Sequence, residues 1–454
     1  MSLCSIRLVG PVLSALLLSS AVASAQTGKG PAGGTGDPNP EPAPPGNAAP
    51  PPRSSPPPKG PPGGTADPSP VIRPPSTPNP PPVPPHEQAA VPDPAEDRIW
   101  VSLEEGLSAR TGRGTFSIRL GFQSQFRFEA SNSSDETRDA SFVMRQARPQ
   151  VRGNVGLPWI RYFIQPELAG GNARLLDIEL DARPVNAIGL RVGQFVTPFS
   201  RTFLTPVPRL QFPDFSVAND YFRTDRDTGA MLYGTPFGDR FEYYAAVFNG
   251  NGINKGANDD KKMLYEGRLV VNPLGRFDYD EVPALAARRP FGFSLGVNAY
   301  RAEQARTTTV ADKTVVTGDT DRNTTVGAEL VLRWSRLAMQ AEVYWRKGTD
   351  KNGDYKARGG YAQASVMVID RRLELAGRFS LLDPRTSIAD DVLRTAEGLL
   401  TFYASGQHLK LQARYTNAHL GASGSVFPQG TGSATVVRPD QTVHSVTLQT
   451  QLFF

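Results

Sequence analysis

The sequence contains very little cysteine, few histidines and no long hydrophobic run. Its single cysteine, Cys4, lies near the N-terminus, so disulfide frameworks, thiolate metal sites and cysteine nucleophiles are excluded from the rest of the chain. No run of about 18 apolar residues occurs, and the mean hydropathy is −0.34, which excludes membrane-spanning helices. Membrane-spanning β-strands are not excluded, because only every second residue of such a strand faces lipid.

Motifs for catalysis and metal binding are also lacking. The four histidines show no paired metal spacing and have no matched acid nearby in sequence. The stretch GFSLG at 292–296 matches a nucleophile elbow, but Ser294 lies in mid-strand alternation rather than on a strand-to-helix turn. The stretch DKNGD at 350–354 lacks the distal glutamate of a calcium loop and predicts an Asn-Gly hairpin. We therefore expect no enzyme, no cofactor, no metal site and no nucleic-acid partner.

The N-terminal quarter of the chain differs in composition from the rest. Arg7, the apolar run LVGPVLSALLLSSAV and the small residues Ala23-Ser24-Ala25 predict a secretory signal peptide over residues 1–25. Residues 26–97 are rich in proline, as in APPPRSSPPPKGPP, and predict a disordered, extended periplasmic spacer. The remaining residues, 98–454, form the third predicted domain. The formal net charge of +5 suits anionic solutes or lipids without choosing between them.

What this third domain does contain is strict alternation of apolar and polar residues. In FSIRLGFQSQFRF (116–128) the phenylalanines lie on one face, and Arg119 and Arg127 lie on the other. Sixteen such runs begin near residues 115, 141, 158, 173, 186, 228, 240, 263, 291, 323, 337, 358, 371, 395, 408 and 441. An even number of runs of about ten residues is typical of a bacterial outer-membrane barrel.

The connections between the runs alternate in length. Those after even-numbered runs are mostly short, and those after odd-numbered runs are mostly long, among them a loop expected at 303–322. Two connections are exceptions: 273–290 is long, and the one around 170–171 is short. A soluble β-sandwich is the alternative, but the packed faces of a sandwich are apolar and its exposed faces mix all polar types. Here Glu, Gln and Arg repeat on one face while aromatics occupy the other, and each arginine turned to lipid would cost about 2–4 kcal/mol near the midplane. We therefore predict an all-β fold, a sixteen-stranded antiparallel transmembrane β-barrel whose aromatic face meets lipid. The predicted location is the outer membrane of a Gram-negative bacterium, with both barrel ends periplasmic.

Several stretches resemble the phosphate-selective porin family of Gram-negative outer membranes. They are FVMRQARPQVRG (142–153), LRVGQFVTPFSRTFL (190–204), RTDRDTGAMLYG (223–234) and YAAVFNGNG (244–252). The resemblance implies a third loop folded into the lumen, a homotrimer, and arginines from loop and wall that bind the anion. Guanidinium groups suit this role because they stay charged and offer forked donors to phosphate oxygens.

Carried onto this chain, the resemblance implies an anion-binding constriction. It consists of Arg145, Arg148, Arg201 and Arg226. Weaker pore-lining candidates lie on neighbouring early strands or beside the third loop, namely Arg119, Arg127, Arg152, Arg161, Arg191, Arg209 and Arg223. Gln146 departs from the two adjacent arginines that the family often shows. Arg145 and Arg148 also have opposite parity unless a bulge intervenes.

Two readings of these arginines remain open at this stage. Each lumenal arginine is either an anion ligand or the counter-charge of a wall carboxylate such as Glu167 or Asp177. The predicted function is a water-filled, anion-preferring diffusion channel for phosphate or similar small anions, embedded in outer-membrane lipid. The alternative is a structural barrel that anchors the membrane to the cell wall through the Pro-rich spacer.

Overall fold

The computed structural model describes residues 97–454 except 104, 136–137, 172, 259, 284, 286–288, 311–312 and 429–435, and describes no side chains for 306–319 and 428. The predicted signal peptide and almost all of the spacer lie outside the described residues. None of the helices in the described part of the chain is long and apolar enough to cross a membrane.

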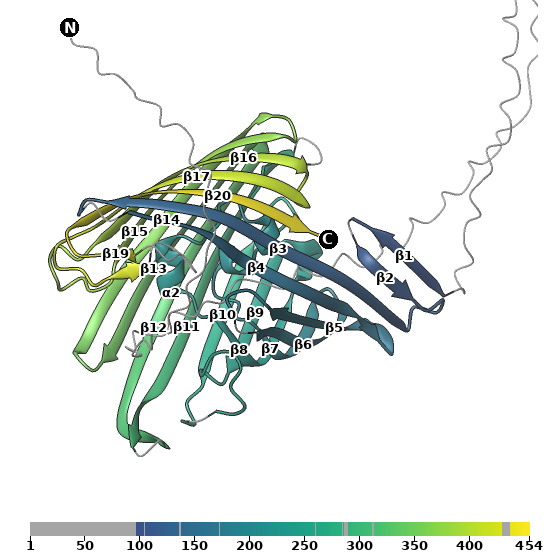
Figure 1. Ribbon diagram of the computed structural model, residues 1–454. Coiled ribbons are helices and arrows are strands. Elements are labelled where there is room, and N and C mark those ends of the chain that lie inside the picture. The colour runs from purple at the N-terminus through teal and green to yellow at the C-terminus, as the bar shows by residue number, and fades with distance from the viewer. Residues whose placement is uncertain are drawn as a thin grey trace, which may run out of the picture. The chain divides into compact units, whose positions relative to one another are not determined.

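Within the described residues, sixteen antiparallel strands close into a barrel, as predicted (Figure 1). The first eight are β3 Phe116–Ser133, β4 Arg138–Val155, β5 Leu157–Glu167, β6 Arg174–Val185, β7 Ile188–Val196, β8 Arg226–Gly234, β9 Phe241–Phe248 and β10 Leu264–Val271. The second eight are β11 Arg289–Val310, β12 Lys313–Ser335, β13 Leu337–Asp350, β14 Gly353–Ile369, β15 Leu373–Asp383, β16 Leu393–Ser405, β17 Leu409–Leu420 and β20 Gln441–Phe453.

The barrel closes where the last strand, β20, pairs with the first, β3. The pairing runs from Val443 opposite Ser133 to Phe453 opposite Gln123. The terminal Phe454 then exchanges backbone hydrogen bonds of 2.9 and 3.0 Å with Phe122. A Cβ on Gly121 would lie 2.6 Å from the Phe454 carbonyl oxygen, so this close approach requires glycine.

Beyond Phe454, a short hairpin takes over as the neighbour of β3. It consists of β1 (Arg98–Ser102) and β2 (Gly106–Arg110), and β2 pairs with the start of β3. Its outward side chains Ile99 and Val101 are 77% and 75% exposed. The hairpin therefore extends the wall, and its apolar face, past the end of the last strand.

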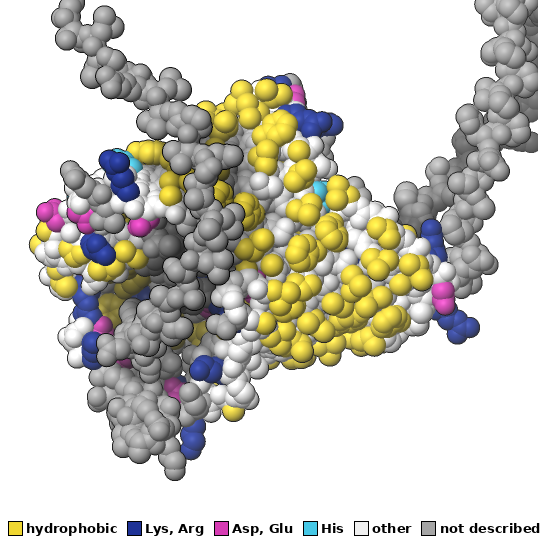
Figure 2. All heavy atoms as spheres, viewed as in Figure 1, with side chains coloured by type: hydrophobic (Ala, Val, Ile, Leu, Met, Phe, Trp, Pro, Cys, Tyr) yellow, Lys and Arg dark blue, Asp and Glu magenta, His cyan; other side chains and the backbone are white. Residues whose placement is uncertain are grey.

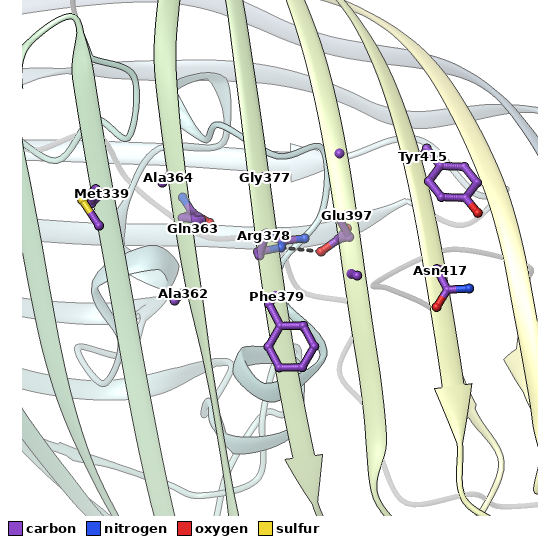
Figure 3. A pocket seen from close by; sticks show the side chains of 12 residues that line it. Met339, Ala362, Gln363, Ala364, Gly377, Arg378, Phe379, Glu397, Tyr415 and Asn417 are labelled. Atoms are coloured by element: carbon purple, nitrogen blue, oxygen red, sulfur yellow. Dashed lines mark hydrogen bonds and ion pairs between the residues drawn. The ribbon is translucent and has the colours of Figure 1, made fainter.

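The two faces of the wall differ as the alternation predicts. Apolar side chains such as Phe126 and Leu448 point outward, and Gln125, Arg127 and Gln449 on the same strands are buried inside. Figure 2 shows hydrophobic side chains gathered over the outer face of the viewed strands. On the outside of β14–β16 small residues such as Gly377 and Gly398 leave a shallow hollow beside Phe379 (Figure 3).

Long connections follow β7, β9, β15 and β17 at one end of the barrel, here called the long-loop end, although the turns after β3, β11 and β13 at that end are short; the opposite end is called the short-turn end. Short turns follow β4, β6, β12, β14 and β16, and both the start of β3 and the end of β20 lie at that end. The expected loop at 303–322 is instead a continuation of β11 and β12, and β12 begins at Lys313 rather than near 323. Its threonines and valines favour extended backbone. The expected hairpin joins β13 to β14, but its turn residues are Lys351 and Asn352 rather than Asn352 and Gly353, and Gly353, with φ +97°, already pairs with Asp350.

Short helices and a minor hairpin lie in the connections. Between β7 and β8 are α1 (Arg201–Leu204), the 3₁₀ helix η1 (Val207–Arg209) and α2 (Val217–Phe222). α3 (Pro236–Asp239) follows β8, and β18 (Phe427–Pro428) pairs with β19 (Val436–Val437) before β20.

Candidate pore constriction

The connection after β7, residues 197–225, folds into the barrel and is here called loop three. Ser200 caps α1 and Ser216 caps α2, each by accepting a hydrogen bond from a backbone N–H in the first turn. Most of its side chains are buried, including the large Phe199, Phe203 and Phe212. A loop surrounded on all sides by side chains of the wall narrows the lumen, which confirms the expectation of an inward third loop.

The root of loop three is held by a carboxylate of the wall. Glu342 of β13 accepts hydrogen bonds from Ser200 Oγ at 2.8 Å and from the backbone N–H of Thr202 at 2.9 Å. The hydroxyls of Tyr344 and Tyr361 donate to the same carboxylate at 2.9 and 2.7 Å. Glu342 is 1% exposed, and these donors compensate the cost of burying its charge.

The middle of loop three is held from the other side by the connection after β10. Its residues 272–283, here called the inward link, enter the lumen, and Val282 packs against Met367 and Tyr403. Glu281 accepts from the Gln211 N–H and from Thr202 Oγ1, both at 3.0 Å. This connection corresponds to the stretch 273–290, which was too long for a turn in the sequence analysis. In the structure it contacts loop three inside the barrel.

The tip of loop three meets arginines from the wall. Asp214 lies 2.8 Å from Arg127 Nη1, 2.8 Å from Arg414 Nη1 and 3.8 Å from Arg145 Nε. Burial raises the pKa of Asp214, but the charges of Arg127, Arg414 and Arg145 outweigh burial and hold that pKa well below its usual range. Asp214 is therefore a permanent anion at neutral pH.

A fourth arginine completes this group. Arg378 Nη2 donates to the Phe215 carbonyl at 3.3 Å, and Arg378 Nε lies 2.5 Å from Glu397 Oε2 (Figure 3). Glu129 lies 3.4 Å from Arg127. We call this set the tip cluster: it contains four guanidinium groups and three carboxylates, and consists of Arg127, Arg145, Arg378, Arg414, Glu129, Asp214 and Glu397.

Residues 116–451 match the model of the family described as phosphate-selective porin O and P. The chain belongs to this family. Family and fold together identify a porin of the Gram-negative outer membrane, a channel rather than an enzyme. No curated protein matches the chain in sequence.

Solved porin structures share the fold of this porin at low sequence identity. The anion-selective porin from Comamonas acidovorans is 13% identical, with a TM-score of 0.54, and the match covers 75% of this chain and 100% of that one. OmpT of Vibrio cholerae, folded in vitro and in a trimer form, is 12% identical with a TM-score of 0.51, covering 74% and 99%. At these identities the likeness shows the fold alone.

The four arginines that the sequence placed at the constriction of the porin lie in separate places. Arg145 belongs to the tip cluster. Arg148 Nε lies 2.7 Å from Glu167, Arg201 Nη1 lies 3.5 Å from Glu329, and Arg226 Nε lies 2.9 Å from Asp177. Glu167 and Asp177, the partners of Arg148 and Arg226, are the two wall carboxylates that the sequence analysis named as counter-charges of lumenal arginines.

A β-bulge explains how Arg145 and Arg148 lie on the same face of β4 although they are an odd number of positions apart. In the pairing of β3 with β4, Gln125 lies opposite Gln146 and Phe126 lies opposite Met144, so Arg145 is the extra residue. The bulge lets Arg145 and Arg148 both turn inward although they are three residues apart.

Arg201 is held differently from the others, by aromatic rings of the inward link. Its guanidinium lies 4.4 Å from the centre of the Tyr279 ring and 5.1 Å from that of Phe277. Cation–π contacts of this kind hold the guanidinium by the ring faces, so the inward link fixes the position of this loop-three arginine.

The weaker candidates also divide between cluster and wall. Arg127 is central to the tip cluster, whereas the others lie elsewhere along the wall or in the loop. Their contacts are Arg119 with Glu105, Arg152 over the Phe163 ring, Arg161 and Arg191 with Asp181, Arg223 with Asp220, and Arg209 through its carbonyl oxygen with the Glu281 N–H.

Sequence reasoning missed seven residues of this site: Arg378, Arg414, Glu129, Asp214, Glu397, Glu281 and Glu342. Alternation does place Arg378, Arg414 and Glu342 on the wet face of their strands. What alternation does not give is the register in which the barrel closes. That register brings β17 next to β20 and β20 next to β3. Asp214 and Glu281 lie in connections, where alternation gives no information.

Proposed function

We propose that this porin is a water-filled diffusion channel that prefers small anions, phosphate among them, and that the tip cluster sets the preference. One observation carries the proposal: four guanidinium groups converge there on three carboxylates. Elsewhere on the wall, pairs such as Arg148 with Glu167 and Arg226 with Asp177 leave little excess charge.

Electrostatics favours a short-range origin of the selectivity. At an effective dielectric constant of about 20, one charge contributes about 4 kcal/mol at 4 Å. At physiological salt, exposed charges beyond about 8–10 Å are largely screened. An ion that passes the tip of loop three therefore responds to the tip cluster far more than to pairs at other heights of the wall.

The proposal includes an orientation and an assembly state. The short-turn end, with both barrel ends, faces the periplasm, and the Pro-rich spacer extends into that compartment. Support comes from the turn lengths, because outer-membrane barrels keep their short turns on the periplasmic side. A homotrimer is proposed from family membership, and the Vibrio cholerae protein described in a trimer form supports it.

Reversal potentials in a potassium chloride gradient test the channel and its selectivity. We expect wild-type protein in planar bilayers to be anion-selective and the Arg127→Gln/Arg414→Gln variant to lose most of that preference. The matched control is Arg148→Gln/Arg226→Gln, which removes the same charge from the wall and changes the ratio less. A cation-selective wild type would refute the proposal. Participation of Arg148, Arg201 and Arg226 in anion binding stays a prediction, which this second variant tests for Arg148 and Arg226 and an Arg201→Gln variant tests for Arg201.

The anchoring function through residues 27–97 is the second candidate, and its supporting observation is the proline-rich composition of that segment. Deleting residues 27–97 separates the two functions. A channel still conducts in planar bilayers after the deletion, whereas an anchor, a plugged barrel, loses its envelope phenotype.

A further inference from the structure

Asp214 is surrounded in the way that a protein surrounds a bound anion. Arg127 Nη1 lies 2.8 and 3.1 Å from its two carboxylate oxygens, and Arg414 Nη1 lies 2.8 Å from the second oxygen. The donors come from β3 and β17, with Arg145 of β4 at 3.8 Å. Asp214 and the three arginines are all nearly or fully buried. The wall thus provides the site, and the loop provides the anion.

The polarity of this contact is opposite to that of the carboxylate contacts at the root and in the middle of the loop. At the root and in the middle of the loop, donors of the loop bind carboxylates, those of Glu342 and Glu281. At the tip, a carboxylate side chain of the loop instead meets arginines of the wall. The Pro213 carbonyl oxygen adds to this contact, because it accepts from Arg127 Nη2 at 2.7 Å.

The tip cluster also holds donor capacity that Asp214 does not use. A carboxylate has two oxygens, whereas a tetrahedral oxyanion has up to four. The Nε of Arg414 is buried and has no hydrogen-bond partner among the described residues. Without Asp214, four guanidinium groups would face two carboxylates, Glu129 and Glu397.

We infer that Asp214 is a tethered occupant of an oxyanion site formed by Arg127, Arg145 and Arg414, and that permeating phosphate enters this site by displacing it. The inference rests on the proposed anion channel. It adds that a side chain of the channel itself, Asp214, competes with the permeating anion for the arginines. A tethered group competes at an effective concentration in the millimolar range or above. Free phosphate therefore binds weakly to the wild-type porin, and ions leave the site quickly.

The test is the block of single-channel chloride current by added inorganic phosphate, measured on the full-length protein. Asp214→Asn keeps the size of the side chain and removes its charge. We expect the concentration of phosphate that halves the chloride current to fall by about tenfold or more in this variant. Asp214→Glu keeps the charge and is expected to stay within about threefold of wild type.

Two further variants separate this mechanism from a general gain of positive charge. Glu167→Gln removes a buried carboxylate from the wall and releases Arg148, so it changes the lumen charge equally at another place. It is expected to leave phosphate block unchanged. Adding Arg414→Gln to Asp214→Asn is expected to abolish the gain, because one of the three ligands is lost.

The outcomes distinguish this inference from the proposed function. If wild type is anion-selective and Asp214→Asn shows unchanged or weaker phosphate block, Asp214 only fastens the loop, and the inference is wrong. An equal gain in Glu167→Gln would also overturn it. If wild type is cation-selective, the proposed function itself fails. Unheated electrophoretic mobility verifies that each variant forms a folded barrel.

Discussion

Glu342 gives the sharpest test of how loop three is held, because one carboxylate binds the root of the loop at several points. It accepts from Ser200 Oγ, from the N–H groups of Arg201 and Thr202, and from two tyrosine hydroxyls. Glu342→Gln replaces one oxygen of the carboxylate by an NH₂ group. This group is itself a donor, and it would face the hydroxyl and N–H donors that the lost oxygen accepted from. At least two charge-assisted hydrogen bonds are lost.

The size of the effect follows from those bonds. A hydrogen bond to a charged group contributes about 1.5–3 kcal/mol, so the loss of two costs about 3–6 kcal/mol. The equilibrium between the seated and the released loop then shifts by at least about 100-fold, since about 1.4 kcal/mol corresponds to a factor of ten. We expect Glu342→Gln to show larger and noisier single-channel conductance with weaker anion preference.

The control for this experiment is Glu167→Gln. Glu167 is also a buried carboxylate that accepts from two backbone N–H groups and an arginine, but its partners lie on β4 and beside β5 and not on loop three. It is expected to keep wild-type conductance. If Glu342→Gln conducts with the amplitude, noise and selectivity of wild type, the loop is not held at its root, and the reasoning is refuted.

Three other expectations can be measured on the same preparations. Burial raises the pKa of Glu281, so its contact with loop three is strongest below the usual carboxylate range and weakens as the pH rises through the raised value. Conductance should thus increase as the pH rises through that raised value, and Glu281→Gln, which imitates the protonated acid, should flatten this dependence; an unchanged pH profile would contradict it. Tyr279→Leu removes a ring face from Arg201 and should increase conductance noise more than Phe237→Leu, an exposed control. Deleting residues 98–110 uncovers the start of β3 and should lower the temperature at which the barrel unfolds in electrophoresis, with conductance unchanged.

Much of the wall could be predicted because alternation is a local property. Phe126 and Arg127 show which side of β3 faces lipid, and the same parity holds for each later strand. The extension of β11 and β12 over 303–322 was missed because polar residues there resemble a loop, although their β-branched members favour a strand.

The site was only partly predictable, because parity gives the face of a residue but not its height or its neighbours around the barrel. Arg127 and Arg414 are far apart in sequence and meet through the closing register of β3, β20 and β17. Arg145 faces inward through a bulge that a single sequence does not specify. Glu281 could be recognised as part of an overlong connection, but its contact with Gln211 depends on the packing of two connections inside the barrel.

The alternation of charge along loop three explains why one loop can be held firmly and still border a pathway for anions. Its root and middle are fastened by the carboxyl groups of Glu342 and Glu281, which accept hydrogen bonds from the loop and are 1% and 4% exposed. If those fastenings were arginines, they would compete with the tip for the permeating anion and trap it along the loop. At the tip, by contrast, several guanidinium groups gather around Asp214. Changes at the root should therefore alter the width of the channel first, whereas changes at the tip should alter its selectivity first.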